Sequence, residues 1–312
     1  MLTKAWKEFH LSRLMLGTVQ FGLPYGVANR TGQPDFRHVV DMLSAAIEGG
    51  VNCFDTAAAY GTSEDVLGRA LDELGAANRV TIVTKVRALT PAELADPQAA
   101  RIAIEKSVSE SRQRLRLDCL PVVLFHREAD ATYQNVLAEL KAKGWLRYYG
   151  VSCDNRPGPA ARFVADEHFS ALQIPANILD PRHPRSGVFQ AAGQRDVAIF
   201  IRSVYLQGLL VMPDEDIPPA LCDVLPARHR LALLAADAGM DLAELALRYM
   251  LSFDDVTCVL AGVETVAQVE HNLAMVNRGP LPTDLLSRIA PAIPELPETI
   301  VNPGLWPPRK VD

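Results

Sequence analysis

A strand-like apolar run followed by a loop and a helix-like segment recurs eight times along the 312-residue chain. The runs are continuously apolar, which is typical of parallel strands buried on both faces. Strands are predicted at 12–19, 51–56, 80–86, 120–125, 148–152, 171–175, 197–203 and 257–262. Single helices are predicted at 36–49, 63–74, 98–116, 132–143, 157–167 and 265–276, and more than one helix is predicted near 227–252. The segment after the sixth strand, around 184–194, is poorly patterned. Eight such units predict a (β/α)8 barrel rather than an open doubly wound sheet.

The chain is expected to form one domain over residues 1–312, because no linker divides the predicted barrel and barrels of this kind reach this length. Ser63 is a candidate cap for the second helix, and one more helix is expected at 284–292. The Pro-rich tail 294–312 is not expected to form a regular helix or a central strand. Its Trp306 suggests that the tail packs against the rest of the protein.

Composition narrows the class of protein. The net charge of −6 and a pI near 5.7 give no electrostatic reason to expect nucleic acid or an anionic membrane as a partner. The five scattered cysteines form neither a disulfide framework nor a metal-binding pattern, which favours a reducing cytoplasm. We see no signal peptide and no apolar stretch long enough to span a bilayer. A globular, cytoplasmic enzyme is the expectation, and the oligomeric state stays open.

Polar residues follow three successive apolar runs. Asp55 ends the second predicted strand, Lys85 ends VTIVTK and His126 follows LPVVLF, while Tyr60 lies in the loop after Asp55. In a (β/α)8 barrel the active site lies at the carboxyl ends of the strands, and adjacent strands would bring these four side chains together.

Such a cluster suits carbonyl reduction. A tyrosine donates a proton poorly at neutral pH, but a nearby ammonium stabilises the phenolate and lowers the pKa of the phenol. Asp55 would hold Lys85 charged and oriented, and His126 would hydrogen-bond the substrate oxygen. Each residue alone also has a structural explanation, as a buried histidine, a solvated lysine or a packing tyrosine. The coincidence of all four at matching strand ends favours the catalytic interpretation.

The sequence resembles the aldo-keto reductases. The run FDTAAAYGTSEDVLGRAL is similar to the family's second-strand motif, with Asp55, Tyr60, Gly61, Ser63 and Glu64 at the matching positions. TIVTK, VLFH, GWLRYYGVS, LQIPAN and LAGVETVAQVEHN resemble later family segments in the same order.

The resemblance implies an NAD(P)(H)-dependent oxidoreductase that reduces an aldehyde or ketone, with Tyr60 as the acid and Asp55, Lys85 and His126 in support. It also implies a cofactor site, whose residues would be Asp55, Ser152, Gln173, Arg202, Ser203, Gly262, Glu264, Thr265, Gln268 and Asn272. Ser152 and Gln173 match positions that hold the nicotinamide carboxamide. The helix that begins at Thr265 matches the adenosine-phosphate site, where a helix N-terminus attracts anions.

Three departures from the family pattern bear on the cofactor. Cys153 replaces a common Asn, and Arg202 replaces an aromatic residue that stacks on the nicotinamide. Gly262 and Glu264 stand where many relatives place Lys or Arg for the 2′-phosphate of NADP(H). Because Glu264 would repel that phosphate and could accept a ribose hydroxyl, we expect NAD(H) to be at least tolerated beside the NADP(H) that the family commonly uses.

Other functions remain open at this point. Lys85 could instead form a Schiff base in a lyase, and the barrel could be a nicotinamide-binding sensor or regulatory subunit without catalysis. A barrel inactivated through Arg202 and Cys153 is a third possibility. The substrate is expected to be a sugar-like or small cyclic carbonyl compound, bound near Gln20, Phe21, Tyr25, segment 180–188 and Trp306.

Overall fold

The computed structural model describes residues 1–26 and 32–306. Eight parallel strands form a closed barrel in the order β10-β3-β4-β5-β6-β7-β8-β9. They are β3 Leu14–Gly17, β4 Cys53–Asp55, β5 Thr81–Val86, β6 Leu120–Phe125, β7 Leu146–Ser152, β8 Ala171–Pro175, β9 Ala198–Arg202 and β10 Cys258–Gly262. The predicted (β/α)8 barrel is therefore confirmed, and each of the eight predicted strands overlaps an observed one.

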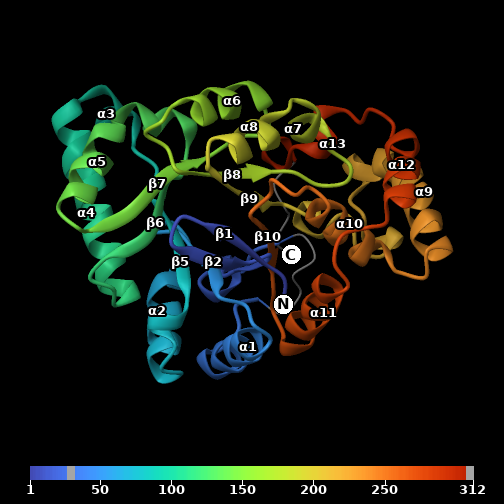
Figure 1. The fold of residues 1–312 in the computed structure, drawn as a ribbon, viewed down its shortest axis with the longest axis horizontal. Coiled ribbons are helices and arrows are strands. Elements are labelled where there is room, and N and C mark those ends of the chain that lie inside the picture. Colours follow the sequence, from blue (N-terminus) through green and yellow to red (C-terminus); the bar gives the residue numbers. More distant parts are fainter. Residues whose placement is uncertain (27–31, 307–312) are drawn as a thin grey trace.

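Helices surround the strands (Figure 1). They are α1 Phe36–Glu48, α2 Ser63–Glu73, α3 Pro91–Ala95, α4 Pro97–Leu115, α5 Gln134–Ala142, α6 Pro157–Ala165, α7 Arg182–Arg185, α8 Val188–Gln194, α9 Leu225–Asp237, α10 Leu242–Leu251, α11 Val266–Asn277, α12 Thr283–Ala292 and α13 Glu298–Val301. The helices predicted near 227–252 are α9 and α10, and the poorly patterned segment 184–194 contains the end of α7 and all of α8. The short α3, which begins with a capping box at Thr90, was not predicted.

Side chains alternate between the inside of the barrel and its helix-covered outside, as the strand period of two requires. Met15, Cys53, Val83, Val122, Leu124, Ala171, Ala198, Phe200 and Cys258 pack together in one cluster. Their strand neighbours, among them Phe54, Ile82, Val123 and Leu172, belong instead to the larger cluster that includes the helices. Both sets are fully buried, which explains why the strands are continuously apolar in sequence.

An N-terminal hairpin, β1 Thr3–Trp6 and β2 Phe9–Ser12, was missed by the sequence analysis. Trp6 and Leu11 belong to the cluster inside the barrel, and the Trp6 ring lies 5.0 Å from that of Tyr148 and 6.2 Å from that of Phe200. The hairpin therefore covers the end of the barrel at which the strands begin. It leaves the carboxyl ends of the strands as the accessible mouth.

A second apolar cluster, which includes Leu209, Leu231, Leu285 and Ile300, joins the segment after β9 to α9, α10, α12 and α13. These helices gather on one side of the barrel (Figure 1). The Pro-rich tail does form one helical turn, α13, because its Pro residues flank the segment Glu298–Val301. Trp306 packs against this cluster and donates a hydrogen bond from Nε1 to the Ile300 carbonyl at 3.1 Å, while residues 307–312 lie outside the described part.

Thr62, not Ser63, is the N-cap of α2, and the Ser63 hydroxyl instead bonds to other loops. Within residues 1–26 and 32–306, no helix combines the length and apolar character needed to cross a bilayer.

Candidate active site

The carboxyl ends of the strands carry polar side chains that continue the interior rows of the barrel. Asp55 lies two residues beyond the interior Cys53, and Lys85 two beyond Val83. The same spacing relates Gln173 to Ala171 and Arg202 to Phe200. Because side chains two apart on a strand face the same way, strand geometry alone directs these groups into one mouth.

Asp55 and Lys85 form a buried ion pair. Lys85 Nζ lies 2.6 Å from Asp55 Oδ1 and donates a second hydrogen bond to the Thr56 carbonyl at 2.9 Å. Gln173 Nε2 donates to the same Asp55 oxygen at 2.6 Å. The side chains of Lys85 and Asp55 are only 1% and 5% exposed, so both charges depend on these partners.

Lys85 also faces Tyr60. Its Nζ lies 4.9 Å from the centroid of the Tyr60 ring. Burial by itself would lower the pKa of Lys85, but the charge of Asp55 and the charge and hydrogen bond of Tyr60 outweigh it and hold the pKa above its usual value. Lys85 is therefore an ammonium at neutral pH, directed at the phenol.

His126 completes the cluster. Its ring is 5.8 Å from the Tyr60 ring, centroid to centroid, in an edge-to-face arrangement. Burial, together with the positive charges of Lys85, Arg202 and Arg127, lowers the pKa of His126 to about 4. The imidazole is consequently neutral at physiological pH, with one nitrogen able to donate a hydrogen bond.

The loop that carries Tyr60 is fixed by close backbone packing. A Cβ atom on Gly22 would lie 1.9 Å from the Tyr60 carbonyl oxygen and 2.4 Å from the Ser63 nitrogen, so only glycine fits there. The Ser63 hydroxyl contacts the hydroxyls of Thr18 at 2.8 Å and Thr56 at 3.0 Å. This buried network joins the loops after β3 and β4 and holds the phenol beside Lys85.

A cavity of about 720 Å³ opens at this mouth. Most residues that the family resemblance implied for catalysis or cofactor binding line it: Asp55, Tyr60, His126, Ser152, Gln173, Arg202, Ser203, Gly262, Glu264, Gln268 and Asn272. Lys85 lies behind Asp55 and Tyr60 rather than on the wall, and Thr265 is not among the lining residues. The volume is in the range that small-molecule sites occupy.

Arg202 enters the cavity from the end of β9. Its guanidinium donates to the Cys153 carbonyl at 3.0 Å and to the Ser203 hydroxyl at 3.3 Å. The Cys153 side chain is buried and does not line the cavity, whereas Ser152 and Gln173 do. Ser203 has a φ of 64°, a left-handed conformation that non-glycine residues adopt only uncommonly.

The N-terminus of α11 forms the far end of the cavity. Thr265 caps it by accepting from the Gln268 N–H, while Gln268 Oε1 accepts from the Glu264 N–H at 2.6 Å. Burial raises the pKa of Glu264. Asn272 accepts a hydrogen bond from the Tyr205 hydroxyl at 3.1 Å, which places Tyr205 beside this end of the cavity.

The residues fit an elongated dinucleotide of the kind that the resemblance implies. Gln20, which is 8% exposed, lines the cavity, and its Oε1 has no hydrogen-bond partner in the described part of the chain. A Cβ on Gly262 would meet the Gln20 amide at 2.8 Å, so the glycine leaves this wall open. An orphan acceptor beside Gly262 on the cavity wall suits a polar ligand that occupies the cavity between the Tyr60 cluster and the α11 N-terminus.

Several lining residues carry no clear sequence signal: Asp154, Tyr205, Gln207, Val211 and His271. They come from loops or from the middle of a helix, where no strand-end position marks them. Gln20 and Tyr25, which were expected near the mouth, do line the cavity, whereas Phe21 is fully buried in the core and segment 180–188 and Trp306 are not on its wall.

Comparison with known proteins matches the chain to one family and to solved structures of the same fold. The model of the Aldo/keto reductase family matches residues 13–293. The chain is 24% identical over 306 residues to the NADH-specific methylglyoxal reductase of Escherichia coli, covering 86% of this chain and 91% of that protein. It is also 24% identical over 329 residues to a probable voltage-gated potassium channel subunit beta of Arabidopsis thaliana, covering 94% and 99%. The holo form of an aldo-keto reductase from Bacillus halodurans has a similar fold, with a TM-score of 0.78, 24% identity and 95% and 97% coverage.

Proposed function

Because the chain belongs to the aldo/keto reductase family, whose members are oxidoreductases acting on carbonyl compounds, we propose that it reduces an aldehyde or ketone to the alcohol with NAD(P)H and that Tyr60 donates the proton. The observation that carries the proposal is the cluster of four side chains at this mouth: Tyr60, Asp55 and His126 line a single cavity, and Lys85 lies behind them, paired with Asp55 and over the Tyr60 ring. A bound nicotinamide supplies the hydride.

Residues of the chain supply the proton and stabilise the charges that develop during the reduction. Tyr60 donates its hydroxyl proton to the carbonyl oxygen, and the Lys85 ammonium stabilises the phenolate that this leaves. Asp55 keeps Lys85 charged, and Gln173 fixes the Asp55 carboxylate from the neighbouring side. The neutral His126 donates a hydrogen bond to the same carbonyl oxygen, which favours the charge that develops there.

Ser152 and Gln173 are proposed to hold the nicotinamide end of the cofactor and the α11 N-terminus its adenosine end. We further propose that NADH is used. Glu264 and the side chain-free Gly262 replace cations at the position of a 2′-phosphate, and the Glu264 carboxylate would repel that group. The name of the Escherichia coli relative, an NADH-specific reductase, is consistent with this choice.

Tyr60→Phe tests the assignment. The variant is expected to lose turnover with every carbonyl substrate while the dissociation constants of NADH and NADPH, measured by quenching of protein fluorescence, stay nearly unchanged. A panel of aldehydes, ketones and keto-sugars, followed at the absorbance of NADH and NADPH, identifies the substrate class. Retained turnover in Tyr60→Phe would remove the residue from its role, and NADPH binding about a hundredfold tighter than NADH would refute the cofactor preference.

Two other functions can be distinguished from carbonyl reduction by experiment. A Schiff-base role for Lys85 is disfavoured because the amine is ion-paired, buried behind Asp55 and protonated, and a protonated amine is not a nucleophile. A regulatory barrel is favoured by the full-length similarity to a channel beta subunit. Cofactor binding without turnover on the whole panel would support the regulatory function, although a sensor has no need of a proton donor. The cytoplasmic location stays a prediction.

A further inference from the structure

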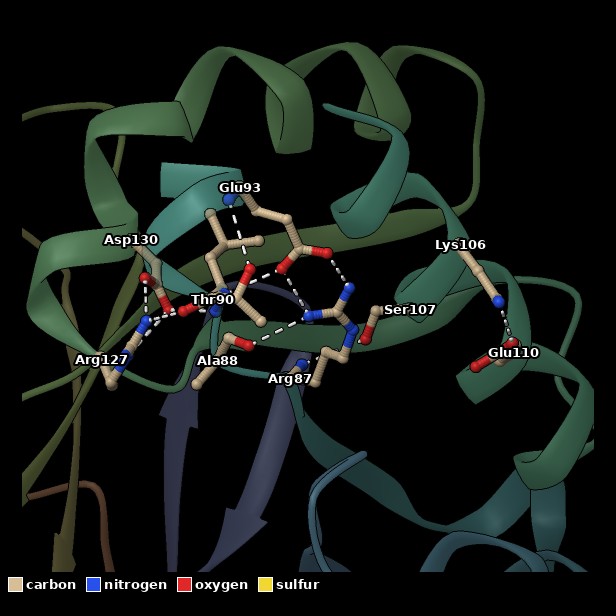
Figure 2. A network of polar contacts seen from close by, with 10 residues as sticks. Arg87, Ala88, Thr90, Glu93, Lys106, Ser107, Glu110, Arg127 and Asp130 are labelled. Atoms are coloured by element: carbon tan, nitrogen blue, oxygen red, sulfur yellow. Dashed lines mark hydrogen bonds and ion pairs between the residues drawn. The ribbon is translucent and has the colours of Figure 1, made fainter. Parts of the chain in front are cut away.

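A buried carboxylate connects the loop after β5 to the loop after β6. Asp130 follows β6, and its side chain is 2% exposed. Arg127 forks onto it, with Nη2 at 2.9 Å from Oδ1 and Nε at 3.3 Å from Oδ2. Figure 2 shows the two side chains facing each other beside the segment that follows β5.

The same pair holds the backbone of Leu89 on both sides. The Leu89 N–H donates to Asp130 Oδ2 at 3.3 Å, and the Leu89 carbonyl accepts from Arg127 Nη2. The loop after β5 is thereby tied to the loop after β6. A second tie lies farther along, where the Tyr133 hydroxyl donates to the Leu94 carbonyl at 2.7 Å.

The loop after β5 is itself firmly anchored. Arg87 binds Glu93 through both terminal nitrogens, at 2.9 and 2.5 Å, and its N–H donates to the Ser107 hydroxyl at 3.1 Å. Glu93 also accepts from the Thr90 N–H in the capping box of α3, as Figure 2 shows. Hydrogen bonds from Arg87 and Thr90 lower the pKa of Glu93 to about 2, so this anchor persists well into acid.

The chain positions of these groups connect the tie to catalysis. Arg127 is bonded covalently to His126, and the anchored loop begins two residues after Lys85. Neither Arg127 nor Asp130 lines the cavity. The pair therefore touches no ligand there, and its effect on the reaction has to pass through His126 and the backbone that carries it.

We propose that Arg127 and Asp130 are positioning residues that fix the His126 ring relative to Lys85 and Tyr60. The inference rests on the proposed reductase function, in which His126 binds the carbonyl oxygen. Without these contacts, His126 would be held only by the end of β6 and would move with the loop that follows it. The tie fixes that loop to the anchored loop after β5, and a ring placed within a fraction of an ångström keeps its hydrogen bond aligned as charge develops.

The charge of Arg127 has a separate effect. His126 faces Tyr60 from the loop after β4, Lys85 from β5 and Arg202 from β9, and Arg127 lies next to it in its own loop. The cationic members of this set all disfavour the imidazolium, with Lys85 contributing most after burial. Loss of the Arg127 charge is therefore expected to raise the pKa of His126, whereas Lys at this position keeps the charge and loses only the two-pronged contact.

Three variants separate these effects. The double variant Arg127→Gln/Asp130→Asn removes the fork without leaving a buried unpaired charge, and Arg127→Lys keeps the charge without the fork. Arg101→Gln is the matched control, because Arg101 forms a similar fork with Glu139, at 2.7 Å, between α4 and α5 on the surface. Each is assayed for kcat, KM and cofactor dissociation constant at a temperature well below its own melting transition.

We expect kcat to fall about tenfold or more in both Arg127 variants, with cofactor affinity unchanged and the control like the wild type. The acid limb of the pH–rate profile should move to higher pH in the double variant and stay in place in Arg127→Lys. Folded variants with wild-type kcat, KM and pH profile would overturn the proposal and leave the pair a purely structural feature.

A readout that needs no turnover separates this inference from the proposed function. In histidine-labelled protein, nuclear magnetic resonance follows the titration of His126 and its through-space contact with the Tyr60 ring, 5.8 Å away in the wild type. The contact should weaken in both Arg127 variants. If the wild type reduces no carbonyl, the reductase proposal fails, but an unchanged contact in the variants would still refute the positioning role by itself.

Discussion

Replacement of Lys85 by Met tests the physical basis of the site most directly. The variant removes the ammonium that lies 2.6 Å from Asp55 and 2.9 Å from the Thr56 carbonyl. Asp55 would keep only the hydrogen bond from Gln173. A carboxylate with 5% side-chain exposure would thus be left without its counter-ion.

The cost follows from that uncompensated charge. Breaking a buried ion pair from one side destabilises a protein by about 3–5 kcal/mol. For a chain of 312 residues, unfolding carries an entropy of about 0.65 kcal/mol/K, so the melting temperature should fall by roughly 5–8 °C. Turnover should be lost as well, because the phenolate of Tyr60 loses its stabilising cation.

A double-mutant cycle separates this explanation from simple loss of packing. Asp55→Asn in the Lys85→Met background removes the buried charge and keeps an acceptor for Gln173, so stability should recover by about 2 kcal/mol or more without recovery of activity. Urea unfolding of the four proteins without cofactor measures the coupling. Lys106→Met, at an exposed lysine 3.8 Å from Glu110, is the control and should cost less than about 0.5 kcal/mol. Strictly additive losses at Lys85 and Asp55 would refute the reasoning.

Three further outcomes are expected. Gly22→Ala should displace the Tyr60 loop, since its Cβ would lie 1.9 Å from the Tyr60 carbonyl oxygen. The kcat should then fall at least about tenfold, and a wild-type kcat would show that the loop shifts without displacing the Tyr60 hydroxyl. Glu264→Arg should bind NADPH about tenfold tighter or more, through a new contact with the 2′-phosphate, and equal tightening of NADH binding would contradict that cause. Burial is the main reason why the pKa values of His126 and His183 are lowered to about 4 in the folded protein. The unfolded chain therefore binds protons at higher pH than the folded one, and the free energy of unfolding should decrease as pH falls from about 6.5 to about 4. Urea unfolding at several pH values should show a weaker decrease in His183→Gln, and an unchanged slope would exclude His183 as a source.

The barrel could be predicted from sequence because its strands are buried on both faces. That burial makes each strand a continuous apolar run and each connection a helix, so the eightfold recurrence is visible without knowledge of contacts. The N-terminal hairpin was missed because its strands are only four residues long and its turn, at Lys7 with a φ of 50°, has no glycine or asparagine. Ser63 was assigned as a cap on its residue type, whereas tertiary packing draws its hydroxyl to Thr18 and Thr56.

The sequence alone determined that Asp55, Lys85 and His126 stand at the ends of successive strands, since parallel strands in a barrel bring their carboxyl ends to one mouth. Only the tertiary structure decided which groups complete the cluster. Gln173 reaches Asp55 from 118 positions away, and the orphan Gln20 faces the cavity because Gly262 has no side chain. Such contacts depend on the direction of individual side chains after the barrel has closed, and no local pattern in the sequence encodes that direction.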